Sequence, residues 1–115
     1  MRILLTGGSG FLGSSIRDHY SGTGVEIVSP SRQELDIRNK NQVDSFFSSN
    51  VIDGIIHTAV SGGRRNEADH YSQMVENLSM FNNLEDHFSK VKKVIHFCSG
   101  AAFGRTDSIY REKEK

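Results

Sequence analysis

The stretch Thr6-Gly7-Gly8-Ser9-Gly10-Phe11-Leu12-Gly13 determines the fold that we expect for this chain. It follows the short apolar run 2–5 and precedes a segment with helical periodicity, so a buried strand leads through a Gly-rich turn into a helix. Gly7 allows the sharp turn, because a residue without Cβ adopts positive φ at little cost. Gly10 lets the backbone approach a pyrophosphate at the positive helix N-terminus, and Gly13 lets the helix lie close to the strands. The alternative is a Gly-rich turn without a ligand.

The rest of the chain alternates strand-like apolar runs with segments of helix length. The expected strands are residues 2–6, residues 25–28, an apolar run within 52–60, and residues 91–98. The expected helices follow the glycines, begin at the cap Asn39, and extend as one long helix from Tyr71 through Phe88. Because no two strands are joined by a hairpin turn, the sheet is expected to be parallel. The predicted fold class is therefore α/β, a doubly wound parallel sheet with strand order 3-2-1-4-5.

The periodicity of the helices predicts which side chains they bury. After the glycines the stripe is Leu12, Ile16, His19 and Tyr20, which we expect to face the sheet. In the next helix Val43, Phe46 and Phe47 share one face. In the long helix the stripe is Tyr71, Met74, Val75, Leu78 and Phe81. This last stripe either covers the sheet or packs on a partner helix, and the sequence leaves both open.

Composition excludes several classes of function. Lys and Arg together number 14, as do Asp and Glu, so no net charge draws the chain to nucleic acid or to a membrane surface. The single cysteine, Cys98, allows no internal disulfide, and the apolar start is too short for a signal peptide or a membrane span. His57 and His96 lie in separate strand-like runs without metal-ligand spacing. We therefore expect a cytoplasmic protein without a metal site.

Thr6 distinguishes the glycine pattern from the G-x-G-x-x-G of ordinary dehydrogenases. It resembles the T-G-x-x-G-x-x-G of the extended short-chain dehydrogenase/reductases, the NAD(P)-dependent epimerase/dehydratase family that acts on nucleotide sugars. The resemblance covers the whole chain but only the N-terminal part of the family. It implies a Rossmann-type NAD(P)-binding domain over residues 1–104, a charged, frayed tail over 105–115, and a C-terminal substrate-binding part that lies outside these residues. The cofactor-binding residues that it implies at the turn are Gly7, Gly10, Phe11, Leu12 and Gly13.

The segment after the second strand bears on the choice of cofactor. An NAD site usually has an acidic residue about 20 positions beyond the glycines, where this chain has Ser29-Pro30-Ser31-Arg32. Hydroxyls and a guanidinium suit a 2′-phosphate, so NADP is expected and NAD is the alternative. The alternative for Arg32 is a solvated surface residue. Glu34 is a competing candidate, which would bind the ribose of NAD. The runs 13–17 and 32–37 look most like those of NADP-using nucleotide-sugar reductases.

Two further segments match the family's cofactor site. Asp36 and Ile37 resemble an Asp-plus-aliphatic pair, which implies that Asp36 accepts from the adenine amino group and that Ile37 packs on the ring. A turn or cap is the alternative for Asp36. The residues Thr58, Ala59 and Val60 resemble the small-residue segment against which the cofactor lies, although many members have alanine or glycine at the position of Val60.

Catalytic residues are only partly present in this chain. Ser99 resembles the serine that hydrogen-bonds the substrate oxygen during hydride transfer, whereas a serine at a strand end is otherwise more often a turn residue. The family's Tyr-x-x-x-Lys pair has no match, since Glu114 stands four positions after Tyr110. Asn77 resembles a helix asparagine that faces the active site, and a polar helix face explains it equally well. We expect cofactor binding without turnover, a nucleotide-sugar substrate in the complete enzyme and, as an option, a homodimer; a non-catalytic NAD(P) sensor is the alternative.

Overall fold

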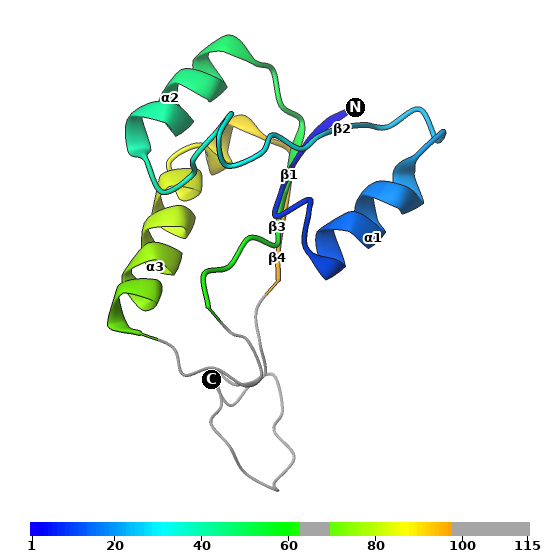
Figure 1. Ribbon diagram of the computed structural model, residues 1–115. Helices are drawn as coiled ribbons and strands as arrows, with labels where there is room; N and C mark the ends of the chain where they lie inside the picture. Colours follow the sequence, from blue (N-terminus) through cyan, green and yellow to red (C-terminus); the bar gives the residue numbers. More distant parts are fainter. Residues whose placement is uncertain (63–69, 98–115) are drawn as a thin grey trace, which may run out of the picture.

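The computed structural model describes residues 1–62 and 70–97 of the chain, and Figure 1 shows its elements. Strands and helices alternate, as the sequence predicts. They are β1 (Arg2–Thr6), α1 (Phe11–Tyr20), β2 (Glu26–Val28), α2 (Lys40–Ser49), β3 (Gly54–His57), α3 (Tyr71–Glu85), the 3-10 turn η1 (Phe88–Lys90) and β4 (Lys93–His96). The predicted tail over 105–115 lies outside the described residues.

All strand pairs in the sheet are parallel. The order is β2-β1-β3-β4, with Leu4 of β1 opposite Val28 of β2 and Ile55 of β3. In the sheet, β2 lies on one side of β1 and β3 lies on the other, so the order of addition of the strands reverses at β1. This is the doubly wound arrangement that the sequence predicts. The carboxyl ends of β1 and β3 therefore flank the point where a ligand binds in such folds.

The predicted order counted five strands, whereas the described residues form four. No strand lies between β2 and α2, because the backbone groups there are used in turns. The N–H of Leu35 donates to the carbonyl of Ser31, and the N–H of Asn39 donates to the carbonyl of Asp36. Leu35 and Ile37 point into the core instead of extending an edge strand. The observed order is the predicted one without its outer strand.

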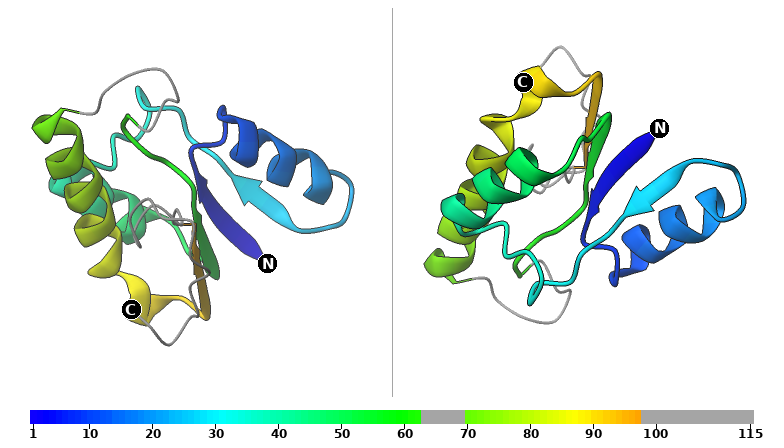
Figure 2. Two further views of the ribbon diagram at one scale, coloured as in Figure 1. Left: turned by 90° about the horizontal axis from the view of Figure 1, so that it is seen from below. Right: turned by 90° about the horizontal axis from the view of Figure 1, so that it is seen from above.

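The helices form one layer on each face of the sheet. In Figure 1 and both views of Figure 2, α1 lies on one side of the strands and α2 and α3 lie on the other. The larger core lies beneath α2 and α3, and the smaller one lies beneath α1. The larger core contains Leu4, Leu35, Ile37, Val43, Phe47, Ile52, Ile55, Met80 and Leu84, and the smaller contains Ile3, Leu5 and Ile56.

The predicted stripe on α1 is only partly buried. Ile16 packs against the smaller core, but Leu12 is 40% exposed and His19 is exposed. The only buried residue of α1 is Gly13, which brings the first turn of the helix against the backbone of the Gly-rich turn. The helix therefore contacts the sheet through Ile16 and its N-terminal turn rather than along the whole stripe.

The long helix is shorter than predicted, and it buries a different face. It ends at Glu85, and Phe88 lies in η1, from which its ring still reaches that of Phe81 at 5.7 Å. The buried apolar residues of α3 are Met80 and Leu84 in its C-terminal half. The stripe residues Tyr71, Met74, Val75 and Leu78 are all exposed. Of the two alternatives for this stripe, coverage of the sheet therefore does not hold for its N-terminal half. None of the described helices is long and apolar enough to cross a membrane.

Candidate cofactor-binding site

A groove with a volume of about 540 Å³ lies at the carboxyl ends of β1 and β3. Its walls are the Gly-rich turn, the segment after β2 and the segment after β3. The predicted site residues that line it are Gly7, Gly10, Arg32, Asp36, Ile37, Thr58, Ala59 and Val60. The predicted residues Phe11, Leu12 and Gly13 lie beside it on α1 and not in its lining. Ser99 lies outside the described residues.

The three predicted glycines differ in what requires them. Gly7 has a φ of 72°, and a Cβ there would lie 2.6 Å from Oγ1 of Thr58. A Cβ on Gly13 would lie 2.0 Å from the carbonyl oxygen of Gly7. A Cβ on Gly10 would meet only that same oxygen, at 3.4 Å. The fold itself therefore requires Gly7 and Gly13, whereas the space in front of Gly10 is open to a ligand.

Gly8 makes a close approach that the sequence did not indicate. It is buried, and a Cβ at this position would lie 1.8 Å from Oγ and 3.0 Å from Cβ of Ser29, which follows β2. A side chain at Gly8 would therefore displace the Ser29 hydroxyl. The contact depends on the approach of the turn to a neighbouring strand, so no spacing within the turn could have revealed it.

The N-terminus of α1 is free to bind an anion. Gly10 is its N-cap, no side chain caps it, and the first turn has no acidic residue. The first N–H groups of a helix have no intrahelical partner and carry the positive end of the helix dipole. The side chain of Phe11 is 92% exposed, and Phe11 does not line the groove.

Thr6 joins the ends of β1 and β3. Its Oγ1 accepts from the N–H groups of Thr58 at 3.1 Å and Ala59 at 3.2 Å, and it lies 2.6 Å from Nδ1 of His57. A hydroxyl has two lone pairs and one proton. Because the two N–H groups occupy the lone pairs, the proton is donated to Nδ1, which must be unprotonated. His57 is therefore neutral, with its proton on Nε2.

The surroundings of His57 favour this neutral form. Burial, followed by the charge of His96, lowers the pKa of His57 from 6.5 to about 4. The two histidines are partners across β3 and β4, and their ring centroids are 5.1 Å apart. The sequence did not place them together, because strand register is not visible in it. Among residues 1–62 and 70–97, no group of three or more potential ligands could hold a metal ion.

Asn77 of α3 fixes the far end of the segment after β3. Its Oδ1 accepts from the N–H of Ser61 at 2.7 Å, and its Nδ2 donates to the carbonyl of Ser61 at 3.0 Å. Thr6 holds the near end of the same segment. Val60, between these two anchors, is 64% exposed and lines the groove. Asn77 thus positions the segment after β3, which forms one wall of the groove.

Arg32 and Glu34, the two candidates for contact with the ribose or its phosphate, both lie in the segment after β2. The carboxylate of Glu34 accepts from the N–H of Ser31 at 2.9 Å, and this hydrogen bond lowers the pKa of Glu34. Arg32 is exposed, and its guanidinium makes no hydrogen bond or ion pair with any residue that the structure describes. Glu34 is tied to its own turn through one carboxylate oxygen, and among the described residues Arg32 keeps all its donors for a ligand, while both residues line the groove.

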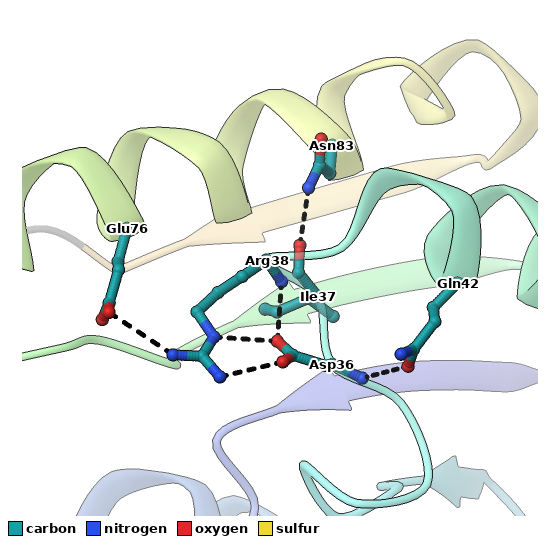
Figure 3. A network of polar contacts seen from close by, with 6 residues as sticks. All are labelled: Asp36, Ile37, Arg38, Gln42, Glu76 and Asn83. Carbon is teal, nitrogen blue, oxygen red and sulfur yellow. Dashed lines mark hydrogen bonds and ion pairs between the residues drawn. The ribbon is translucent and has the colours of Figure 1, made fainter.

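Asp36 has a partner that the sequence analysis missed. Nε and NH2 of Arg38 donate to its two carboxylate oxygens at 2.9 and 2.8 Å, and the N–H of Arg38 donates at 3.0 Å, as Figure 3 shows. The side-chain hydrogen bond from Arg38 holds the pKa of Asp36 below its usual value. NH1 of Arg38 reaches Glu76 of α3 at 3.4 Å. The turn predicted as the alternative for Asp36 is observed, and its role toward adenine stays a prediction.

Comparisons with known proteins agree with this geometry. The model of the NAD dependent epimerase/dehydratase family matches residues 3–115. GDP-L-colitose synthase of Yersinia pseudotuberculosis is 35% identical over 86 residues, which are 73% of this chain and 28% of that protein. GDP-L-fucose synthase of Azorhizobium caulinodans is 28% identical over 106 residues, which are 89% of this chain and 34% of that protein.

A solved structure is similar along most of the described fold. It is the GDP-mannoheptose C4 reductase of Campylobacter jejuni with NADP bound, 29% identical, with a TM-score of 0.82 over 95% of this chain and 37% of that one. The chain thus spans about a third of the length of these relatives. The family model, the relatives and the shared fold together show that the chain belongs to the NAD dependent epimerase/dehydratase family.

Proposed function

We propose that this chain is the NADP-binding part of a cytoplasmic nucleotide-sugar epimerase, dehydratase or reductase that transfers hydride at a sugar carbon. The observation that carries the proposal is the uncapped N-terminus of α1, which opens on a groove at the ends of β1 and β3. A pyrophosphate there would accept from the free N–H groups, and Gly10 leaves room for it. When bound, the cofactor supplies or takes the hydride.

The preference for NADP rests on the segment after β2. Arg32 lines the groove without a partner among the described residues, while the carboxylate of Glu34 is held by Ser31. A 2′-phosphate would gain a charge-assisted hydrogen bond from Arg32. A relative whose structure contains NADP supports the same choice. The free ribose hydroxyl of NAD would instead need an acceptor, and it would gain no charge-assisted hydrogen bond from Arg32.

The sugar end of the reaction is proposed from the relatives alone. Their names specify GDP-linked sugars, so a GDP-sugar is the first substrate to test. Ser99 is the residue that we propose for contact with the reacting oxygen, and it lies outside the described residues. A noncatalytic sensor of NAD(P) is the alternative, and it would bind the cofactor without converting any nucleotide sugar.

Calorimetric titration with NADP and NAD at one salt concentration tests the proposal. We expect tighter binding of NADP by about 10- to 150-fold, the ratio given by one charge-assisted hydrogen bond, and its loss in Arg32→Ala. Lys40→Ala is the matched control, because Lys40 is an exposed cation of α2 paired with Asp44, away from the groove. A preference for NAD would point to Glu34. A folded chain that binds neither nucleotide would refute the proposal.

A further inference from the structure

We propose that Arg38 is a positioning residue for cofactor recognition, because it locks Asp36 with a single acceptor site open to the adenine amino group. This inference rests on the proposed function and adds to it two residues, Arg38 and Glu76, that no comparison assigns to the site. Figure 3 shows Asp36, Arg38 and Glu76 together.

The hydrogen bonds of Asp36 leave one acceptor site. An ionised carboxylate has about four lone-pair sites, two on each oxygen. Oδ1 accepts from both the N–H and Nε of Arg38, and Oδ2 accepts from NH2 of Arg38 alone. The site left among the described residues is therefore on Oδ2. The side chain of Asp36 is 25% exposed, and Asp36 lines the groove, so the carboxylate is accessible to a ligand there.

Two helices fix the position of this carboxylate. The N–H of Asp36 donates to Oε1 of Gln42 in α2 at 2.9 Å, and the carbonyl of Ile37 accepts from Nδ2 of Asn83 in α3 at 2.8 Å. Ile37 is buried in the larger core, so its chain position cannot shift freely. Arg38 adds a side-chain link to Glu76 of α3. The orientation of Asp36 is thus set by the protein before any ligand arrives.

The open site on Oδ2 favours a hydrogen-bond donor. Asp36 accepts from Arg38, which also pairs with Glu76, and the charge of Arg32 acts on Asp36 as well. An ionised carboxylate only accepts, so the N6 amino group of adenine, which donates, fits the open site. Hypoxanthine has a carbonyl oxygen at the same ring position, and an acceptor facing a carboxylate is unfavourable.

The test compares NADP with its hypoxanthine analogue by calorimetry on the full chain and on Arg38→Gln. We expect the chain to bind NADP at least about tenfold more tightly than the analogue, as one hydrogen bond to a charged group predicts. In Arg38→Gln this ratio is expected to fall to about threefold or less, because the carboxylate can rotate away from the ring. A general loss of structure would weaken both ligands and leave the ratio unchanged.

Two other variants keep the test decisive. Glu76→Gln leaves the pair between Arg38 and Asp36 intact and is expected to lower the ratio less, so it serves if Arg38→Gln does not fold. Lys40→Gln removes a more exposed charge that lies outside the groove, and it should leave the ratio unchanged. An unchanged or larger ratio in folded Arg38→Gln would overturn the inference and leave cofactor binding intact. Absence of binding to the folded parent chain would overturn the proposed function and this inference together.

Discussion

Oγ1 of Thr6 donates to Nδ1 of His57 across a distance of 2.6 Å, and this contact joins the ends of β1 and β3 beneath the groove. Both side chains are about 5% exposed or less. The same oxygen accepts from the N–H groups of Thr58 and Ala59, so one hydroxyl satisfies three buried or partly buried partners. A threonine before the glycines thus has a role in the fold besides marking the family.

Thr6→Val should be strongly destabilising, although the two side chains have nearly the same shape. The substitution leaves Nδ1 of His57 and the N–H of Ala59 without their partner, and each unsatisfied group costs about 1–3 kcal/mol. The N–H of Thr58 keeps a hydrogen bond to the carbonyl of Thr6 at 3.3 Å. We expect the free energy of unfolding to fall by roughly 2–4 kcal/mol, measured by urea denaturation at neutral pH. Thr6→Ser keeps the hydroxyl and should lose much less. Equal losses in the two variants would contradict this account.

The lowered pKa of His57 predicts that acid destabilises the fold. The pKa is about 4 in the folded chain and 6.5 ordinarily, so between these pH values the unfolded chain binds the additional proton. The contribution is complete above pH 6.5 and is lost as the pH falls toward about 4, at no more than about 1.4 kcal/mol per pH unit. Urea denaturation across this range measures it.

The matched variant is His57→Asn, whose Oδ1 can still accept from Thr6 but does not titrate. Its free energy of unfolding should vary less between pH 6.5 and about 4 than that of the parent chain, by roughly 2–3 kcal/mol. Subtracting one curve from the other removes the carboxylates that also lose stability in acid, such as Asp36 and Asp44. Parallel curves would show that His57 titrates normally.

In the Gly-rich turn, Gly13 is needed for the fold, whereas Gly10 is expected to be needed for cofactor binding. Gly13→Ala places Cβ 2.0 Å from a backbone oxygen that cannot move, and should destabilise the chain by about 2 kcal/mol or more. Gly10→Ala meets nothing closer than 3.4 Å and should change stability by less than about 1 kcal/mol. Its NADP affinity should nonetheless fall by at least about tenfold, because the methyl group occupies the space of the pyrophosphate. Denaturation and calorimetry on both variants check this reversal.

The sequence predicted those parts of the fold that depend on local pattern. The strand, turn and helix around Gly7 and Gly13, the Asn39 cap of α2 and the parallel sheet follow from spacing and propensity, and they are confirmed. It was wrong about the end of α3, which is Glu85 and not Phe88, and it left open which residues of the stripe meet the sheet. Met80 and Leu84 are buried, while Tyr71 at the start of the helix is exposed.

The sequence named most of the residues that line the groove among its candidates, but it did not reveal their contacts. The residues at the strand ends could be named because parallel strands bring their carboxyl ends to one edge. The ion pair between Asp36 and Arg38 could not, since residues two positions apart have no fixed relation outside a helix or strand. The clash at Gly8 and the neighbouring rings of His57 and His96 depend on how distant strands pack.

Asn77 should control the order of the groove wall that ends at Ser61. Its amide group makes two hydrogen bonds with the backbone of Ser61, at 2.7 and 3.0 Å, and Asn77→Leu removes both while keeping a side chain of similar size. The N–H of Ser61 should then exchange with solvent at least about tenfold faster, because opening it no longer breaks a hydrogen bond worth about 1.4 kcal/mol. The N–H of Thr58, which donates to Thr6, is the internal control and should keep its exchange rate. If both amides accelerate together, Asn77 stabilises the whole segment, and if neither does, the Ser61 contact contributes nothing to its order.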